Sequence, residues 1–322
     1  MTNFYMLVGL PGSGKSNIAK KMKEENPIRL YSLDEIFSSD ELRKELWGNE
    51  NTQGNNSVLF KELHNRIKFC LENGVDCIYD ATNISSKRRI AFLNELKKFN
   101  NLNKTCIFVL TSIEKCFKNN KNRERKIPEE VIRNMYLRFE IPQYREGWDN
   151  IIIKRQFDRQ RDYLKNMDKL RKIPHDNPHH LLSIGDHMCA CTEYVTKNYA
   201  LKINTYMLRI LFEAAFFHDI GKPFTKVFKD SQGNDTDIAH YYGHENVSAY
   251  LYLLYCSSKE LREEQEITLY VADLIGLHMR MFNIVKEMEL GNYQPKEKLI
   301  KLIGKEKYNA LVLLNQADIA CS

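Results

Sequence analysis

An apolar run at residues 4–8 leads directly into the segment Gly9-Leu10-Pro11-Gly12-Ser13-Gly14-Lys15-Ser16. This segment fits the pattern G-x-x-x-x-G-K-[ST], and a helical pattern follows it at Ser16–Glu25. Glycines let successive backbone N–H groups curve around phosphates, and the N-terminus of the following helix attracts negative charge. The strand–loop–helix context therefore predicts a nucleotide-phosphate site, and it constrains the first half of the chain to a fold of parallel strands and helices.

Two side chains of this loop have specific expected tasks. Lys15 would reach the β- and γ-phosphate oxygens of ATP, and Ser16 would hold Mg²⁺. Backbone groups of the remaining motif residues would surround the phosphates: Gly9, Gly12, Ser13 and Gly14. A glycine-rich turn without a ligand is the alternative, but the preceding strand and the following helix favour the phosphate site.

The rest of the first half alternates short apolar runs with helical patterns, which is typical of a parallel α/β sheet. We predict strands at Phe4–Leu10, Val75–Tyr79, Cys106–Leu110 and Ile151–Lys154, with another between Ile28 and Phe37. Helices are predicted at Ser16–Glu25, Val58–Leu71, Lys87–Phe99 and Glu129–Phe139. The predicted fold of this half is a parallel sheet flanked by helices.

The pattern changes after Ile153. A charged, helix-prone run at Arg155–Arg171 is followed, from His180 onward, by helical periods alone, as at Tyr206–Phe217, Glu245–Tyr255 and Thr268–Leu277. The sequence therefore predicts an α/β domain at residues 1–155, a helical linker at 156–172 and an all-α domain at 173–322.

Bulk composition agrees with two domains in a chain of 322 residues. Residues 1–155 hold 27 Lys and Arg against 20 Asp and Glu, whereas residues 156–322 hold 21 against 22. The basic surplus of the first half favours a polyanionic partner. No apolar run approaches the roughly 18 residues of a membrane span, and no signal region is evident. We therefore expect a cytoplasmic protein that does not contact membranes. The eight cysteines form no C-x-x-C pair, and we expect them to be reduced thiols.

Phosphoryl transfer also needs a base for the acceptor hydroxyl and an arginine for the charge on the phosphoryl group. Asp40 and Arg43 lie one helical turn apart, so both can face one acceptor. Asp40 could take the hydroxyl proton while Arg43 grips an adjoining phosphate. Two alternatives remain open: Asp34 is a rival base, and Asp40 would also make a good helix N-cap.

Two later segments supply further candidates. Asp80 ends an apolar strand, where it could hold the water shell of the metal or contact the acceptor, and Asn83 could brace the loop. The basic run Asn120–Pro128 is interpreted as a lid. Within it, Arg123 would neutralise charge that develops on the phosphoryl group, and Arg125 would assist.

Four segments that carry these residues resemble the polynucleotide 5′-kinase branch of P-loop phosphotransferases: SSDELRKELWGNENTQGNN, CIYDATNISSKRR, NKNRERKIPEEVIRNM and IPQYREGWD. The resemblance covers residues 4–155 and implies transfer of the ATP γ-phosphate to a 5′-OH end of RNA or DNA. The resemblance implies that Lys15 binds phosphate, that Ser16 binds the metal and that Asp40 is the base. It also implies that Arg43 clamps the acceptor and that Arg123 belongs to the lid. The stretch between Lys15 and Asp40 is longer than this pattern implies, which keeps Asp34 as an alternative.

Histidine distribution separates the halves again, because only His64 of the nine histidines precedes residue 175. His218 and Asp219 end an apolar helix, and two adjacent buried polar groups need a partner such as a divalent metal. Mixed imidazole and carboxylate ligands suit Mn²⁺, Fe²⁺, Co²⁺ or Ni²⁺. Other candidate ligands occur at His187, His244, His278 and Asp318. Lys222 could bind phosphate oxygens, Glu245 could support the ligands from behind, and His179 and His180 could reach the rim of the site.

The order H…HD…H…H…D resembles the HD phosphohydrolase superfamily, across residues 173–322. The resemblance implies that one metal is held by His187, His218, Asp219 and Asp318. His244 and His278 match members of the superfamily that bind a second metal. Two such metals would share a hydroxide and clamp a phosphoryl group during in-line attack.

A 5′-OH kinase joined to a phosphohydrolase resembles end-healing enzymes of bacteria and phages. The expected function is repair of nucleic-acid ends, with RNA favoured over DNA. One activity would phosphorylate 5′-OH, and the other would remove 2′,3′-cyclic, 2′- or 3′-phosphate, so that a separate RNA ligase could join the ends. The alternative is a small-molecule or nucleoside kinase fused to an HD nucleotidase or dNTPase.

Overall fold

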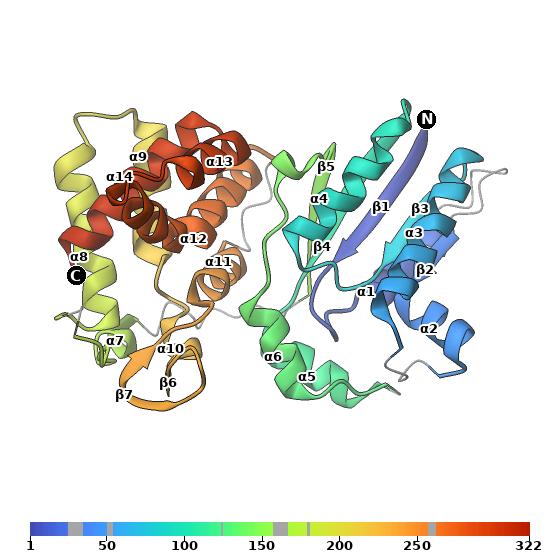
Figure 1. Cartoon of the computed structure of the whole chain (residues 1–322), viewed down its shortest axis with the longest axis horizontal. Helices are drawn as coiled ribbons and strands as arrows, with labels where there is room; N and C mark the ends of the chain where they lie inside the picture. Colours follow the sequence, from blue (N-terminus) through green and yellow to red (C-terminus); the bar gives the residue numbers. More distant parts are fainter. Residues whose placement is uncertain (25–34, 50–53, 124, 157–166, 179–180, 257–261) are drawn as a thin grey trace. The chain divides into compact units, whose positions relative to one another are not determined.

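The structure is a computed structural model, and it describes residues 1–24, 35–49, 54–123, 125–156, 167–178, 181–256 and 262–322. The chain divides into two compact units. The first comprises Met1–Tyr136 and Pro142–Asp158, and the second comprises Leu137–Ile141 and Arg159–Ser322 (Figure 1). Each unit has its own core and carries its own group of chemistry-bearing side chains.

The first unit is built on a five-stranded sheet in the order β2-β3-β1-β4-β5. Its strands are β1 (Thr2–Val8), β2 (Glu35–Ser38), β3 (Cys77–Asp80), β4 (Leu102–Leu110) and β5 (Asn150–Arg155). Every neighbouring pair is parallel. Asp80 is in register with Leu7 of β1 and with Ser38 of β2, so these strands end at one edge of the sheet.

Helices cover both faces of this sheet, because successive residues of β1 point to opposite faces and both sets are apolar. Leu7 packs with Ala19 of α1 (Lys15–Glu24) in one buried cluster. Phe4 meets Phe92 of α4 (Ser86–Glu95) edge to face, with ring centroids 5.6 Å apart. The other helical elements of this part are α2 (Ser39–Trp47), α3 (Asn56–Glu72), η1 (Leu96–Lys98), α5 (Ile113–Lys121), α6 (Glu129–Leu137) and η2 (Tyr144–Glu146).

The predicted parallel sheet with flanking helices is confirmed, and the bounds differ in detail. Gly9 and Leu10 belong to the loop rather than to β1, which ends at Val8, and their carbonyl oxygens accept hydrogen bonds from Lys15. Helix α5 was not predicted; the Ser112 hydroxyl caps it by accepting a hydrogen bond of 3.3 Å from the Lys115 N–H. The expected strand between Ile28 and Phe37 corresponds to β2, and its first part lies outside the described residues.

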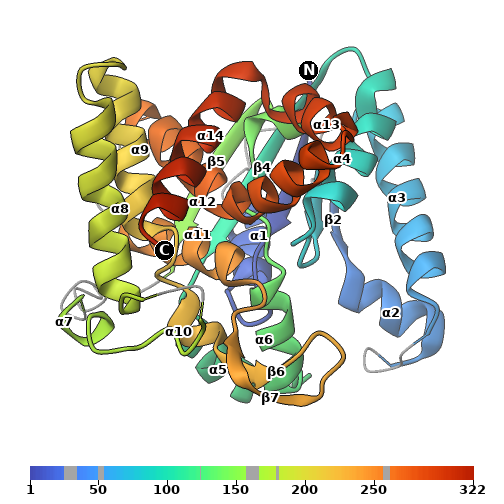
Figure 2. The same cartoon turned by 60° about the vertical axis from the view of Figure 1, so that its left-hand side comes forward.

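The second unit is mainly helical, as predicted. Its helices are α7 (Met167–Leu170), α8 (Ile184–Tyr199), α9 (Thr205–Phe217), α10 (Lys222–Thr225), α11 (His244–Tyr255), α12 (Arg262–Glu289), α13 (Gln294–Ile303) and α14 (Lys305–Ala320). Helix α8 packs beside α9 and α14, and α12 packs against α9, α11 and α14 (Figure 2). This arrangement surrounds a core to which α8, α9, α11, α12 and α14 each contribute buried side chains.

One part of the second unit is not helical. The strands β6 (Val227–Lys229) and β7 (Asp235–His240) form an antiparallel hairpin between α10 and α11. The Asp230 carboxylate accepts hydrogen bonds from the N–H groups of Gln232 and Asn234, and Gly233 takes a φ of +90° in the turn. The sequence reading missed this hairpin, because a strand of three residues is too short to show an alternating pattern.

Two further observations bear on the expected chemistry of the chain. All eight cysteines are free thiols, as expected. Among the helices that the structure describes, none combines the length and the apolar character that crossing a bilayer requires.

Candidate functional sites

The loop between β1 and α1 adopts a backbone that only glycine tolerates at two positions. Gly12 and Gly14 have φ values of +78° and +97°, in the left-handed region that side chains disfavour. A Cβ on Gly12 would also lie 2.4 Å from the Cys116 carbonyl oxygen. The loop therefore needs glycine at these positions in order to curve around a ligand.

Lys15 lies folded against this loop at the start of α1. Its ammonium donates hydrogen bonds to the carbonyl oxygens of Gly9, at 3.0 Å, and Leu10, at 2.8 Å. Burial lowers the pKa of Lys15, and the nearby Asp80 carboxylate opposes that shift. A cation held in this way at a helix N-terminus is suited to bind anionic phosphate oxygens.

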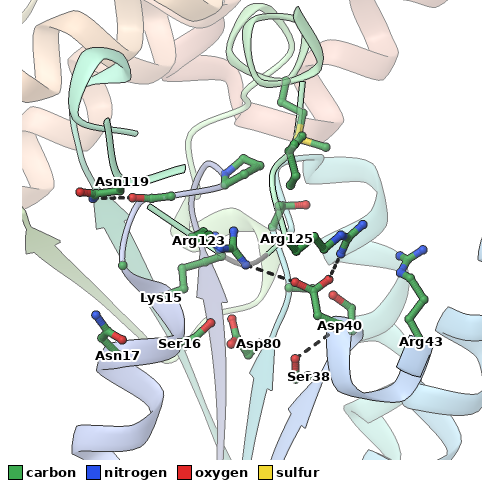
Figure 3. Close-up of a pocket in the computed structure, with 18 of the residues that line it drawn as sticks. Lys15, Ser16, Asn17, Ser38, Asp40, Arg43, Asp80, Asn119, Arg123 and Arg125 are labelled. Atoms are coloured by element: carbon green, nitrogen blue, oxygen red, sulfur yellow. Dashed lines mark hydrogen bonds and ion pairs between the residues drawn. The ribbon is translucent and has the colours of Figure 1, made fainter. Parts of the chain in front are cut away.

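A cavity of about 560 Å³ adjoins the loop at the carboxyl edge of the sheet (Figure 3). The structure brings most of the predicted residues of the first unit together in its walls, from the loop, the start of α1, the end of β3, α2 and the segment before α6; the predicted Gly9 and Ser13 do not line it. The predicted residues that line it are Gly12, Gly14, Lys15, Ser16, Asp40, Arg43, Asp80 and Arg123. Further wall residues include Phe60, Arg88, Arg125 and Met135. The wall thus carries more arginine and lysine than acidic groups, which favours a ligand with several negative charges.

Asp40 lies in the first turn of α2, and its side chain points toward the basic segment before α6. Ser38, not Asp40, is the N-cap of this helix, because the Ser38 hydroxyl accepts hydrogen bonds from the Asp40 and Glu41 N–H groups. The reading of Asp40 as an N-cap is therefore wrong. One carboxylate oxygen of Asp40 pairs with Arg125 Nη1, and the other lies 3.4 Å from Arg123 Nη2 (Figure 3).

Arg43 follows Asp40 by one turn of α2 and faces the same cavity. Its guanidinium donates a hydrogen bond of 3.3 Å to the Asn56 side-chain oxygen at the start of α3. The Trp47 ring lies 6.0 Å from the Arg43 guanidinium carbon. Contacts with the start of α3 and with its own helix therefore hold Arg43 in the wall of the cavity. The rival base Asp34 lies outside the described residues.

The segment after β3 is tied to the phosphate-binding loop. Asp80 is buried at the end of the strand and lines the cavity. As predicted, Asn83 braces the segment, since its amide donates a hydrogen bond of 2.9 Å to the Leu7 carbonyl oxygen. The Gly9 N–H also donates to the Thr82 carbonyl oxygen, at 3.1 Å. The position of Asp80 therefore depends on the position of the loop, and the reverse also holds.

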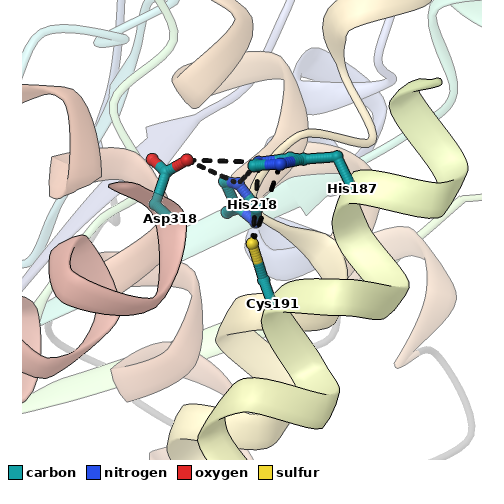
Figure 4. A group of neighbouring side chains, drawn as sticks. All are labelled: His187, Cys191, His218 and Asp318. Atoms are coloured by element: carbon teal, nitrogen blue, oxygen red, sulfur yellow. Dashed lines mark hydrogen bonds and ion pairs between the residues drawn. The ribbon is translucent and has the colours of Figure 1, made fainter. Parts of the chain in front are cut away.

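The second unit gathers the predicted imidazoles and carboxylates at one buried centre. His187 comes from α8, His218 and Asp219 from the turn directly after α9, His244 from the start of α11, His278 from α12 and Asp318 from α14. All six residues are at most 5% exposed. Figure 4 shows the His187, His218 and Asp318 side chains pointing toward one another from different helices.

Each imidazole is oriented by its Nδ1 atom, which faces an oxygen of the backbone. His218, His244 and His278 donate to the carbonyl oxygens of the third residue before them, at 2.7–2.8 Å. His187 Nδ1 lies 3.2 Å from the Cys321 carbonyl oxygen. A proton on each Nδ1 leaves the Nε2 lone pair as an acceptor, which is the tautomer that binds a metal.

The Nε2 atoms form two close pairs on either side of one carboxylate. His187 and His218 Nε2 lie 3.2 Å apart, and so do His244 and His278 Nε2. Asp219 Oδ2 lies 3.5 Å from His187 and 3.3 Å from His218, whereas its Oδ1 lies 3.2 Å from His244 and 3.9 Å from His278. Asp318 adds an oxygen 3.1 Å from His187. Asp219 therefore bridges two sets of donor atoms.

These side chains form two groups that could each hold a metal ion. Two lone pairs at 3.2 Å repel unless a positive charge lies between them. Burial lowers the pKa of His218, but the Asp219 and Asp318 carboxylates outweigh burial and raise it to about 10. For His278, burial and the neighbouring His244 and His218 lower the pKa to about 3. The centre thus attracts positive charge and has imidazole and carboxylate donors for two cations.

Lys222 lies beside the bridging carboxylate. Its ammonium is 2.6 Å from Asp219 Oδ2 and 5.4 Å from the centre of the Tyr241 ring. Burial would raise the pKa of Asp219, but the charges of His218 and Lys222 outweigh burial and lower it well below its usual range. Glu245 lies 3.7 Å from His244 Nδ1, which already faces the Tyr241 carbonyl oxygen at 2.7 Å. His179 and His180 lie outside the described residues.

A known family matches part of the first unit. Residues 4–142 match the model of a family described as an AAA domain. These residues hold the P-loop and most of the parallel sheet. The chain is similar to L-seryl-tRNA(Sec) kinase of Methanococcus maripaludis, at 32% identity over 154 residues, which are 45% of this chain and 55% of that protein. The chain thus spans about half the length of this curated relative.

A solved structure, that of the Pnkp1/Rnl/Hen1 RNA repair complex, is also similar to this chain. The likeness has 20% identity, covers 42% of this chain and 42% of that one, and has a TM-score of 0.34. At this score it does not bear on function.

In the first unit, Arg125, which was expected to assist Arg123, makes a closer ion pair with Asp40 than Arg123 does. Sequence reasoning left out two residues that the structure adds. In the second unit, Cys191 Sγ lies 3.6 Å from His187 Nε2, and the His175 ring lies 5.6 Å from the His187 ring. The spacing of Cys191, four residues after His187, was the available signal for that residue; the sequence held none for His175.

Proposed function

We propose that the chain is a bifunctional enzyme that heals nucleic-acid ends, with a polynucleotide 5′-kinase domain at residues 1–155, a linker at 156–172 and an HD phosphohydrolase domain at 173–322. The observation that carries the proposal is the presence of two separate groups of chemistry-bearing side chains in one chain. One lines the basic cavity beside the P-loop. The other is the buried centre in which Asp219 bridges two pairs of imidazoles.

The kinase part of the proposal rests on the groups around the cavity. Mg²⁺·ATP would supply the phosphoryl group. Lys15 would bind its β- and γ-phosphate oxygens, and Ser16 and Asp80 would bind the cation and its water. Asp40 would accept the proton of the acceptor hydroxyl, and Arg43 would hold an adjoining phosphate. Arg123 and Arg125 would stabilise the charge of the transferring group.

The ion pairs of Asp40 with Arg123 and Arg125 place the proposed base beside the two arginines that would stabilise the transferring phosphoryl group. A base that is held by Arg125 is unavailable to a hydroxyl, so the arginine has to move toward the phosphates when the nucleotide binds. The same movement would bring positive charge to the transferring group and release Asp40.

The phosphohydrolase part rests on the second centre. One cation would be held by His187, His218, Asp219 and Asp318, and the second by Asp219, His244 and His278. Bound cations of this kind supply an activated water and neutralise phosphate charge. Lys222, which is buried beside Asp219, would bind an oxygen of the departing phosphate and would hold the bridging carboxylate ionised.

A polynucleotide is the favoured substrate of both parts, and RNA is favoured over DNA. The first unit carries the basic surplus, and four arginines line its cavity. The relative named for seryl-tRNA also acts, by its name, on a molecule that contains RNA. The products would be a 5′-phosphate and a free 3′-OH, which are the ends that a separate RNA ligase joins.

A panel of substrates tests the proposal. The kinase assay compares 5′-OH RNA, 5′-OH DNA, seryl-tRNA and nucleosides as acceptors of labelled γ-phosphate. The phosphatase assay compares oligonucleotides with 2′,3′-cyclic, 2′- or 3′-phosphate against dNTPs, with Mn²⁺ or Ni²⁺. Preference for nucleosides and dNTPs would overturn the polynucleotide proposal in favour of a metabolic kinase with a nucleotidase.

A further inference from the structure

A fully buried ion pair in the first unit lies outside the cavity. Arg89 of α4 is 1% exposed, and the Glu146 side chain of η2 is 0% exposed. Arg89 Nε and Nη2 donate to the two oxygens of Glu146, at 2.8 and 2.7 Å. Ser86 and Trp148 donate to the same carboxylate, at 2.9 and 3.0 Å. The pair is therefore rigid and well satisfied.

A buried ion pair of this kind gains little stability over apolar residues of similar size, because both charges lose their hydration. Its geometry, in contrast, holds the groups around it in one arrangement. The question is therefore which group the pair orients.

The remaining nitrogen of the guanidinium, Nη1, contacts the segment after β3. Arg89 Nη1 donates a hydrogen bond of 2.8 Å to the Asn83 carbonyl oxygen. Asn83 has a φ of +47°, in the left-handed region, so its backbone needs support to remain there. The Asn83 side-chain amide in turn donates a hydrogen bond to the Leu7 carbonyl oxygen, and the Thr82 carbonyl oxygen accepts one from the N–H of Gly9, the first glycine of the P-loop. The guanidinium thus fixes the segment that follows Asp80.

We propose that Arg89 and Glu146 are positioning residues of the kinase centre, which set the place of Asp80 relative to Lys15 through Asn83. Neither side chain lines the cavity. Their effect would be on the rate of phosphoryl transfer rather than on nucleotide affinity, since P-loop backbone groups and Lys15 hold the phosphates. The inference rests on the proposed kinase function.

The test uses the full chain with the double variant Arg89→Met/Glu146→Gln. Methionine keeps much of the volume without the guanidinium. Glutamine keeps the shape of the Glu146 side chain and one of its two acceptor oxygens, which Ser86 and Trp148 occupy separately. We expect kcat of phosphoryl transfer to fall about 100-fold, the size expected of a displacement near 1 Å, with KM for ATP nearly unchanged. Hydrogen exchange in peptides that contain Asp80–Ser85 should become faster, while exchange in α8–α14 stays unchanged.

The matched control is Lys98→Met/Glu72→Gln, which removes an exposed ion pair of 2.6 Å from the same unit. This control should change neither kcat nor exchange at Asp80–Ser85. If the double variant does not fold, Arg89→Lys replaces it, because an ammonium can pair with Glu146 but lacks the planar fork that also reaches Asn83.

The outcomes separate the two proposals. Wild-type kcat and unchanged exchange in the double variant would overturn the positioning role. A wild-type enzyme that phosphorylates no acceptor would overturn the proposed kinase, and the exchange measurement would then decide the positioning role by itself.

Discussion

His187 Nε2 and His218 Nε2 lie 3.2 Å apart, although the Nδ1 atom of each ring already faces a backbone carbonyl oxygen. Their lone pairs can share this space only with a positive charge between them. The same relationship recurs at His244 and His278, on the other side of Asp219. The protein has thus placed two acceptor pairs around one carboxylate, which is an arrangement suited to cations.

The bridging carboxylate should therefore control the metal content. We expect Asp219→Asn to lower the number of bound transition-metal ions per chain, because the amide carries no charge and cannot bridge two cations through two oxygens. Inductively coupled plasma mass spectrometry of the purified protein measures this number. The control Asp235→Asn changes a carboxylate that is 89% exposed and should leave the number unchanged. Equal metal content in the wild type and Asp219→Asn would exclude Asp219 as a ligand.

Removal of metal should weaken the second unit, because ligands that bind only the folded state stabilise it by mass action. After chelation, Asp219, Asp318 and the imidazoles would be left without the cations. We expect a lower melting temperature, which Mn²⁺ or Ni²⁺ restores, and differential scanning fluorimetry measures it. The His244→Ala/His278→Ala variant should respond less to added metal. A melting temperature that changes neither on addition of chelator nor on addition of metal would argue against the metal centre.

Asp40 should act as the base of the kinase. Asp40→Asn keeps the size of the side chain but cannot accept a proton, and loss of general-base catalysis typically costs about 10²- to 10⁴-fold in rate. We expect this fall in kcat with little change in KM for ATP, measured with labelled ATP and a 5′-OH oligonucleotide. Asp34→Asn is the matched control. A large loss in Asp34→Asn alone would assign the base to Asp34 instead.

His64 should make the first unit sensitive to acid. The His64 ring stacks on the Phe92 ring with the ring centroids 3.9 Å apart, and burial lowers the pKa of His64 from 6.5 to about 4. At a pH between these two pKa values, His64 is protonated in the unfolded chain but neutral in the folded chain. Stability from the neutral ring is therefore complete above pH 6.5 and is lost as the pH falls toward 4. We expect His64→Phe to lose less stability between pH 7 and 5 than the wild type, by urea titration; an equal loss would contradict this role.

Much of the architecture could be predicted from sequence, because its signals are local. The P-loop motif, the apolar strands and the helical periods each lie within a short stretch of chain. The HD dipeptide at His218 and Asp219 likewise ends an apolar helix, so its burial could be expected. Spacing also suggested that Asp40 and Arg43 share a helix face, and both line the cavity.

What sequence could not supply depends on contacts between distant segments. Glu146 is 57 residues from Arg89, and no periodicity connects them. The ion pair of Asp40 with Arg125 depends on how the basic segment before α6 folds back across the cavity. The N-cap role of Ser38 could have been weighed against that of Asp40, since both residues favour caps, but only the backbone geometry decides between them.

One measurement tests most directly whether two independent centres heal both ends of a strand. An RNA with 5′-OH and 2′,3′-cyclic phosphate is incubated with ATP, Mg²⁺ and Mn²⁺ or Ni²⁺, and both ends are identified by mass spectrometry. The account predicts 5′-phosphate and 3′-OH with the wild type, an unchanged 5′ end with Lys15→Ala, and an unchanged 3′ end with Asp219→Asn. A wild-type enzyme that alters only one end, or a single variant that abolishes both changes, would contradict it.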